Sequence, residues 1–170
     1  MAAKTQGVAD QFALCLPVLL TMIAVLVLAS PSFAGLRYAP QVWIVALFFW
    51  RVYSPSAVPY WAAFLIGLMY DVVSGAPLAS HALAAFISVL VLERFARRLV
   101  RLSFRLLWIG AAVFTAMVMA LSAVIAVVAG GTVTASWLSA GWIATTASYP
   151  LWHALCAVVL KLVPVGSLRD

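Results

Sequence analysis

The chain has 170 residues, of which 67% are hydrophobic and only 8% are charged. A soluble domain of this size is about half apolar and about a quarter charged, so this composition excludes an ordinary water-soluble protein and favours one embedded in lipid. The formal net charge is +6, because ten lysines and arginines are set against four acidic residues. In so apolar a chain we interpret the basic residues as determinants of membrane orientation rather than as a nucleic-acid site.

Charged residues and turn signals divide the chain into apolar stretches near the length that crosses a bilayer as a helix, roughly 20 residues. The predicted helices cover 12–30, 40–54, 58–75, 77–93, 106–129 and 136–162. This pattern predicts an all-α polytopic membrane protein with about six transmembrane helices in a single domain. The second helix is the shortest, so its crossing requires a thin membrane, a half-buried path or an Arg51 side chain that snorkels to the interface.

Basic residues predict the orientation of the chain. With both ends cytoplasmic, every lysine and arginine except Arg37 lies on the inner side, as the positive-inside rule requires. In the alternative interpretation the first apolar run is a signal peptide that ends in the small residues of 32–34. Asp10 and the length of the run disfavour that alternative.

Asp71 is the most informative residue, because a carboxylate inside a membrane span costs several kcal/mol unless it is paired, protonated or hydrated. Gly67, Asp71 and Gly75 are four residues apart, so they share one helical face against which another helix can pack closely. Arg37 and His81 are the candidate cationic partners of the Asp71 carboxylate. We expect a helix-packing or partner-organising site here, and a proton or ligand site is the alternative.

The sequence contains no recognisable catalytic or metal-binding pattern. His81 and His153 are expected at opposite depths of the membrane, whereas a metal site needs three or four converging ligands. The patterns G-x-S-x-G, H-E-x-x-H and the P-loop are missing from the sequence, and so are paired carboxylates. Cys15 and Cys156 lie in apolar stretches and are interpreted as packed core residues. We therefore expect no enzymatic activity, no metal and no cofactor.

The segment 93–106 has a different pattern, with arginines on one helical face and apolar residues on another. The arginines are Arg94, Arg97, Arg98, Arg101 and Arg105. This pattern predicts a short amphipathic helix on the inner membrane surface. Its role is either to anchor the chain to anionic phospholipids or to dock a cytoplasmic partner.

An ordered set of residues within 38–93 resembles a known family. The set is Pro40, Trp43, Trp50, Pro55, Gly67, Leu68, Asp71, Gly75, Leu78, His81, Ala82 and Leu83. In this order it resembles the bacterial rod shape-determining protein MreD family. Three features depart from the family pattern: an extra residue separates Pro40 from Trp43, Phe49 replaces the usual tyrosine, and Ala79 stands where glycine is usual. Beyond residue 106 the similarity is one of hydropathy alone.

The resemblance implies a non-catalytic inner-membrane scaffold of the cell-elongation complex, which maintains rod shape. Its implied partners are the bitopic protein MreC, a RodA-type polymerase with its penicillin-binding transpeptidase on the outer side, and the MreB filament in the cytoplasm. In this interpretation the 67–75 region is the centre of an outer helix junction, and the arginines are a candidate filament-facing surface.

The resemblance also implies a fold similar to that of the substrate-binding subunits of energy-coupling-factor vitamin transporters. The alternative function is therefore a small-solute-binding membrane subunit. It requires a solvent-reaching pocket lined by Asp71 together with several polar residues of the spans. Those residues are Thr115, Ser122, Thr145, Thr146, Ser148 and His153.

Overall fold

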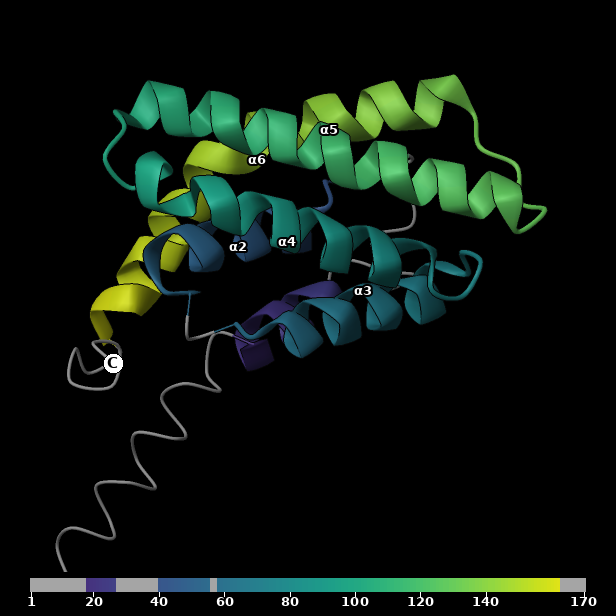
Figure 1. Ribbon diagram of the computed structural model, residues 1–170, viewed down its shortest axis with the longest axis horizontal. Coiled ribbons are helices and arrows are strands. Elements are labelled where there is room, and N and C mark those ends of the chain that lie inside the picture. The colour runs from purple at the N-terminus through teal and green to yellow at the C-terminus, as the bar shows by residue number, and fades with distance from the viewer. Residues whose placement is uncertain (1–17, 27–39, 56–57, 163–170) are drawn as a thin grey trace, which may run out of the picture.

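The computed structural model describes residues 18–26, 40–55 and 58–162, and the regular structure within these ranges is entirely helical. Residues 18–26 form a helical segment, and the following helices are α2 (Val42–Tyr53), α3 (Tyr60–Ser74), α4 (Ser80–Leu99), α5 (Phe104–Val128) and α6 (Ala135–Leu162). Figure 1 shows that the α3–α4 and α5–α6 turns lie at one end of the bundle, which we call the junction end. The α4–α5 turn lies at the opposite end, which we call the arginine end.

Helix α2 is the central helix of the bundle. Every residue from Val42 through Val52 is buried, and α2 packs against α4, α5 and α6. A helix that is apolar on all sides is suited to such a position. With 12 residues, α2 is too short to cross a full hydrocarbon core. Neighbouring helices rather than lipid cover it, and the Arg51 side chain is buried instead of snorkelling to the surface.

The structure does not contain the separate surface helix that was expected over 93–106. Helix α4 continues to Leu99, a turn covers 100–103, and α5 begins at Phe104. The reason lies on the buried face of α4, where Val89, Leu92 and Ala96 follow one another at helical spacing and pack inward. This face extends past the first charged residues, so the helix does not end where the charges begin.

Helices α5 and α6 are, among the described residues, the two that are long and apolar enough to cross a membrane by length and composition. They exchange two indole hydrogen bonds. Pro150 lacks an N–H, so the carbonyl of Thr146 has lost its helical donor. The indole N–H of Trp108 donates to this carbonyl at 2.7 Å, and that of Trp142 donates to the carbonyl of Ala112 at 2.9 Å. The Trp108 bond satisfies a backbone carbonyl that would be costly to leave unpaired in lipid.

Candidate functional site: the Asp71 helix junction

Asp71 lies in the last turn of α3 and is completely buried, with 0% of its surface exposed. Its carboxylate points at the first turn of α4. Oδ1 accepts hydrogen bonds from the hydroxyl of Ser80 at 2.9 Å and from the backbone N–H of His81 at 3.0 Å. Oδ2 accepts the backbone N–H of Ala82 at 3.2 Å. Asp71 therefore caps a helix other than its own.

The position of this carboxylate explains how an acidic residue is accommodated in an apolar bundle. The first N–H groups of an α-helix have no partner within the helix and carry partial positive charge. No side chain of α4 itself caps these groups. Hydrogen bonds to an ionised acceptor are about twice as strong as neutral ones, and here they replace the water that Asp71 loses.

Gly67 lies one turn before Asp71 and allows the two helices to approach. A Cβ atom at position 67 would lie 2.7 Å from both Cα of Ala82 and the carbonyl oxygen of His81. Both of these atoms belong to the backbone, so they cannot move aside as a flexible side chain would. The absence of a side chain at Gly67 thus brings the first turn of α4 within reach of the carboxylate.

The turn between α3 and α4 begins and ends with a residue in the left-handed region. Gly75 has φ of 68° and follows α3 directly, and Ala79 has φ of 70° and directly precedes α4. Ala79 is the only non-glycine residue with positive φ in the described part of the chain. This conformation costs an L-residue about 1–2 kcal/mol, which gives a physical reason for the glycine that the resembling family usually has there.

His81 occupies the centre of the junction. Its Nδ1 lies 2.7 Å from Oδ1 of Asp71, so in the neutral ring Nδ1 carries the proton and Nε2 presents a lone pair. The ring makes edge contacts with Tyr70 and Trp43, with centroids 4.8 and 6.1 Å away. Trp43 is itself buried, with 2% exposure. The other expected partner of Asp71, Arg37, lies outside the described residues.

The remaining residues of the sequence pattern divide between the two ends. Leu78 is 72% exposed on the junction turn, and Leu83 is 40% exposed one turn into α4. Pro40 precedes α2, and Trp50 is buried in it. The residues of the pattern that meet at the Asp71 junction are those within 67–82 together with Trp43, which contacts the His81 ring.

Arg51 forms a second organised site, near the arginine end, that the sequence analysis missed. It is 4% exposed, and its Nη1 donates to the carbonyls of Pro55 and Val58 at 3.0 and 3.1 Å. Nη2 lies 3.5 Å from the carboxylate of Glu93, and the guanidinium carbon lies 4.6 Å from the centre of the Tyr60 ring. Arg51 thus holds the α2–α3 connection against α4. The available signal was a basic residue four positions before a proline, in a chain with few charges.

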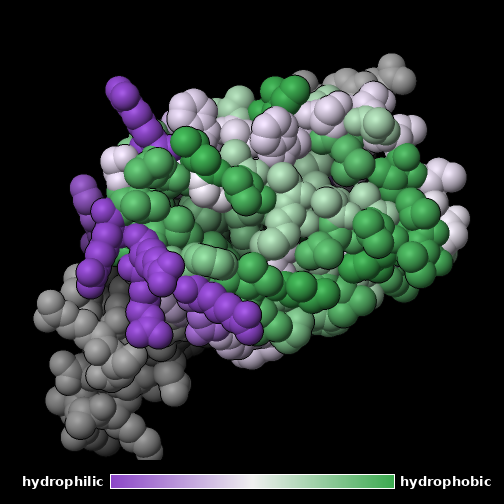
Figure 2. Space-filling view, turned by 45° about the horizontal axis from the view of Figure 1, so that its top comes forward, coloured by the Kyte–Doolittle hydropathy of each residue, from purple (hydrophilic) through white to green (hydrophobic). Residues whose placement is uncertain are grey.

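The five arginines of the 93–106 segment are all exposed. Arg94, Arg97 and Arg98 lie in the last turns of α4, Arg101 lies in the turn, and Arg105 lies at the start of α5. None of them forms an ion pair with another described residue. Figure 2 shows hydrophilic side chains gathered at one end of an otherwise apolar surface. Exposed arginines of this kind can bind an anionic lipid surface or an acidic partner.

The two histidines do not converge, and no group of residues with metal-ligand chemistry occurs within the described ranges. His153 packs among aromatic rings towards the arginine end, and its Nε2 lies 3.2 Å from the hydroxyl of Tyr53. A pocket at the junction end includes His81, but Asp71 does not line it. Of the six polar residues required by the solute-binding alternative, only Ser122 lines this pocket. That alternative is not supported.

Comparison with known families identifies the chain. A family model described as rod shape-determining protein MreD matches residues 8–163, far beyond the 38–93 range of the sequence resemblance. No curated protein and no solved structure gives a match. The matched family consists of non-enzymatic membrane proteins that act in the MreBCD rod-shape system. The resemblance seen in the sequence is confirmed, and the chain belongs to the rod shape-determining protein MreD family.

Proposed function

We propose that this protein is a multi-pass scaffold of the inner membrane that maintains rod shape by linking wall-synthesis partners to the cytoplasmic filament. An MreC-type protein, and through it a RodA-type polymerase and its transpeptidase, would associate on the outer side. The MreB filament would lie on the inner side. Membership of the MreD family supports the general role, and the two different ends of the bundle support the assignment of sides.

Charge separation between the two ends is the observation that carries this proposal. The arginine end presents five exposed arginines, whereas the turns of the junction end, 75–79 and 129–134, contain no charged residue. The positive-inside rule assigns the arginine end to the cytoplasm. The junction end would then face the outer side, and six crossings would leave both chain ends cytoplasmic.

The Asp71 junction would act on partners indirectly. Asp71 is buried and its hydrogen bonds are made within the chain, so its role is to fix the surface presented by the α3–α4 turn. Leu78 is the most exposed large apolar side chain of that turn. A partner that packs against the turn would therefore depend on the geometry that Asp71 imposes.

Affinity purification of the tagged chain from its host tests this proposal. Wild type and two variants would be compared, Asp71→Asn and the matched control Thr115→Val. Thr115 is also buried, but its hydroxyl bonds only to the carbonyl of Ala111 in its own helix. We expect an MreC-type protein to be recovered with wild type and Thr115→Val, and recovery to fall severalfold with Asp71→Asn at equal membrane abundance.

The result that would contradict the scaffold role is equally specific. Recovery of an ATPase module with its coupling subunit, in place of an MreC-type protein, would rule it out. Undiminished recovery with Asp71→Asn would instead leave the scaffold role standing and remove the junction from it. Cell shape provides an independent readout, since cells that depend on Asp71→Asn should become rounded.

A further inference from the structure

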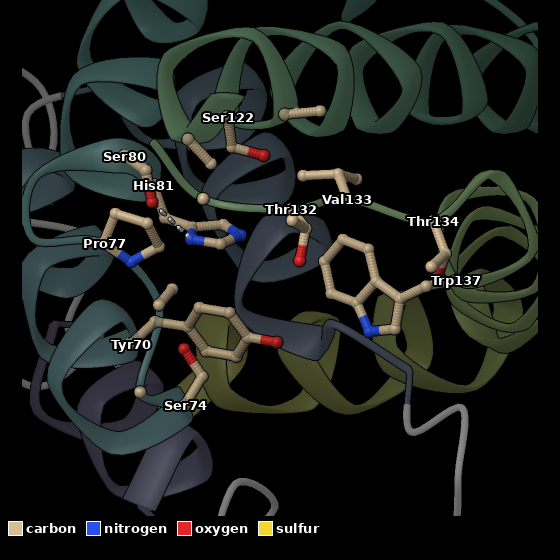
Figure 3. Close-up of a pocket in the computed structure, with 15 residues that line it drawn as sticks. Tyr70, Ser74, Pro77, Ser80, His81, Ser122, Thr132, Val133, Thr134 and Trp137 are labelled. Atoms are coloured by element: carbon tan, nitrogen blue, oxygen red, sulfur yellow. Dashed lines mark hydrogen bonds between the residues drawn. The ribbon is translucent and has the colours of Figure 1, made fainter. Parts of the chain in front are cut away.

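A pocket of about 680 Å³ opens at the junction end, next to the Asp71 junction. Its volume is within the roughly 300–1,000 Å³ that is usual for small-molecule sites. Figure 3 shows that its walls come from the end of α3, the start of α4, helix α5 and the 131–137 segment that leads into α6. Two stretches far apart in the sequence, 70–81 and 122–137, thus line one space at the end opposite the arginines.

His81 supplies this pocket with a buried acceptor that has no partner. The ring is 5% exposed, and its Nδ1 is held by Asp71, so the ring cannot turn freely. Nε2 is buried and makes no hydrogen bond with any described residue. Figure 3 shows this nitrogen pointing toward the middle of the pocket, in the direction of Thr132. A ligand that donates a hydrogen bond here would satisfy a group that the fold leaves unpaired.

Other polar groups on the walls are also available. Figure 3 shows Tyr70 and Trp137 reaching toward the middle of the pocket from different elements, with the Thr132 hydroxyl between them. Within the described part of the chain, the hydroxyls of Tyr70 and Thr132 and the indole N–H of Trp137 have no hydrogen-bond partner. Hydroxyls both donate and accept, so the walls suit a ligand with groups of both kinds.

The lack of charged side chains on the described walls of the pocket narrows the class of ligand. No aspartate, glutamate, lysine or arginine is found among the described residues that line the pocket. A phosphate or carboxylate group is normally recognised by arginine or lysine, so an anionic ligand lacks its usual partner here.

We propose that this pocket binds a neutral sugar ring. Sugar hydroxyl or amide groups would donate to Nε2 of His81 and exchange hydrogen bonds with Tyr70 and Thr132. The apolar faces of the ring would pack on the aromatic side chains of Tyr70 and Trp137. This inference goes beyond the scaffold role and depends on the proposed topology only for the side from which the sugar arrives.

Two probes test the proposal on the full chain in detergent. Methyl N-acetyl-β-glucosaminide is tested by saturation-transfer NMR, and monoglucosyldiacylglycerol by native mass spectrometry against diacylglycerol without the sugar. We expect wild type to bind at least one probe selectively. Binding of the soluble probe alone would indicate a free glycan, and binding of the glycolipid alone would indicate a lipid-linked sugar, and either supports the proposal.

Variants connect any binding to this pocket. His81→Asn places an amide nitrogen near the position of Nδ1 while it deletes Nε2, and Trp137→Leu removes one aromatic face. Each should weaken binding about tenfold, the usual effect of one lost hydrogen bond or ring contact. Trp61→Leu is the matched control, since Trp61 is 61% exposed at the start of α3 and does not line the pocket.

Three outcomes would overturn the proposal. In the first, neither probe binds wild type. In the second, the two pocket variants bind as tightly as wild type while hydrogen exchange shows that the first turn of α4 is intact. In the third outcome, a photo-reactive side chain at position 132 captures a protein in cells rather than a glycan. That result would assign the pocket to a protein partner and would not contradict the scaffold role.

Discussion

Asp71 and Arg51 are both buried charged side chains in an apolar bundle, but the surrounding structure compensates them differently. Asp71 receives backbone N–H groups from the start of α4, with additional donors from Ser80 and His81. Arg51 donates to the carbonyls of Pro55 and Val58 and approaches Glu93. The acid thus uses the positive end of a helix, and the base uses the carbonyls of a loop. Each charge fixes one connection between helices.

The two sites also differ in how well they should tolerate substitution of their residues. The Asp71 junction is closed, because both carboxylate oxygens are occupied and Gly67 packs against backbone. The Arg51 site is looser, since Glu93 is half exposed and lies 3.5 Å away. We therefore expect substitutions at the junction to have larger effects than substitutions around Arg51.

Gly67→Ala should have the largest effect. Its methyl group would lie 2.7 Å from backbone atoms of α4, so the helices must separate and the capping bonds lengthen. We expect a loss of about 4 kcal/mol in the free energy of unfolding, measured by denaturant titration in detergent. Gly110→Ala is the matched control, since its Cβ would lie at least 3.4 Å from its neighbours. Equal losses in the two variants would contradict the close-approach explanation.

Asp71→Asn should lower the free energy of unfolding by about 3 kcal/mol, because an amide N–H would then face the N–H donors at the start of α4. The loss of stability should be confined to the junction end of the bundle. Backbone amide exchange should accelerate at His81 and Ala82 and remain unchanged at Ser54, whose N–H bonds to Trp50 near the arginine end. Acceleration at both ends would show that the two connections are not independent.

Arg51→Lys should lower the free energy of unfolding by about 2 kcal/mol, since a single ammonium cannot replace a fork whose Nη1 holds two carbonyls while its Nη2 lies near Glu93. Here exchange should accelerate around Ser54 and remain slow at the start of α4. Arg105→Lys provides the control, because Arg105 is exposed and its charge is conserved. If Arg51→Lys were as stable as this control, the Arg51 hydrogen bonds would not stabilise the connection.

Ala79→Gly should have the smallest effect and the opposite sign. Glycine adopts positive φ without the Cβ penalty, so we expect a stabilisation of about 1 kcal/mol, measured as a higher midpoint of unfolding. The reverse change at the other end of the turn, Gly75→Ala, should be destabilising because Gly75 also has positive φ. If both variants were destabilised, packing rather than backbone conformation would control the turn.

Much of the candidate site could be predicted from the spacing of its residues, but the way in which the Asp71 carboxylate is stabilised could not. The four-residue spacing of Gly67, Asp71 and Gly75 indicated a shared helical face, and the sequence named His81 as a possible partner. The sequence could not predict that the carboxylate caps the backbone of α4, because backbone N–H groups do not form a sequence pattern. The partners of Arg51 could not be predicted for a similar reason, since they are mostly carbonyls of a loop.

Sequence alone determined that the chain is helical, apolar and a member of the MreD family, because composition, periodicity and an ordered set of residues are local properties. Tertiary structure decided that α2 is the central helix, that α4 continues through the first charges, and that His81 faces a pocket with an unpaired nitrogen. In a chain this apolar, hydrophobicity does not distinguish a face that packs on protein from one that meets lipid. Only the arrangement of the helices around one another makes that distinction.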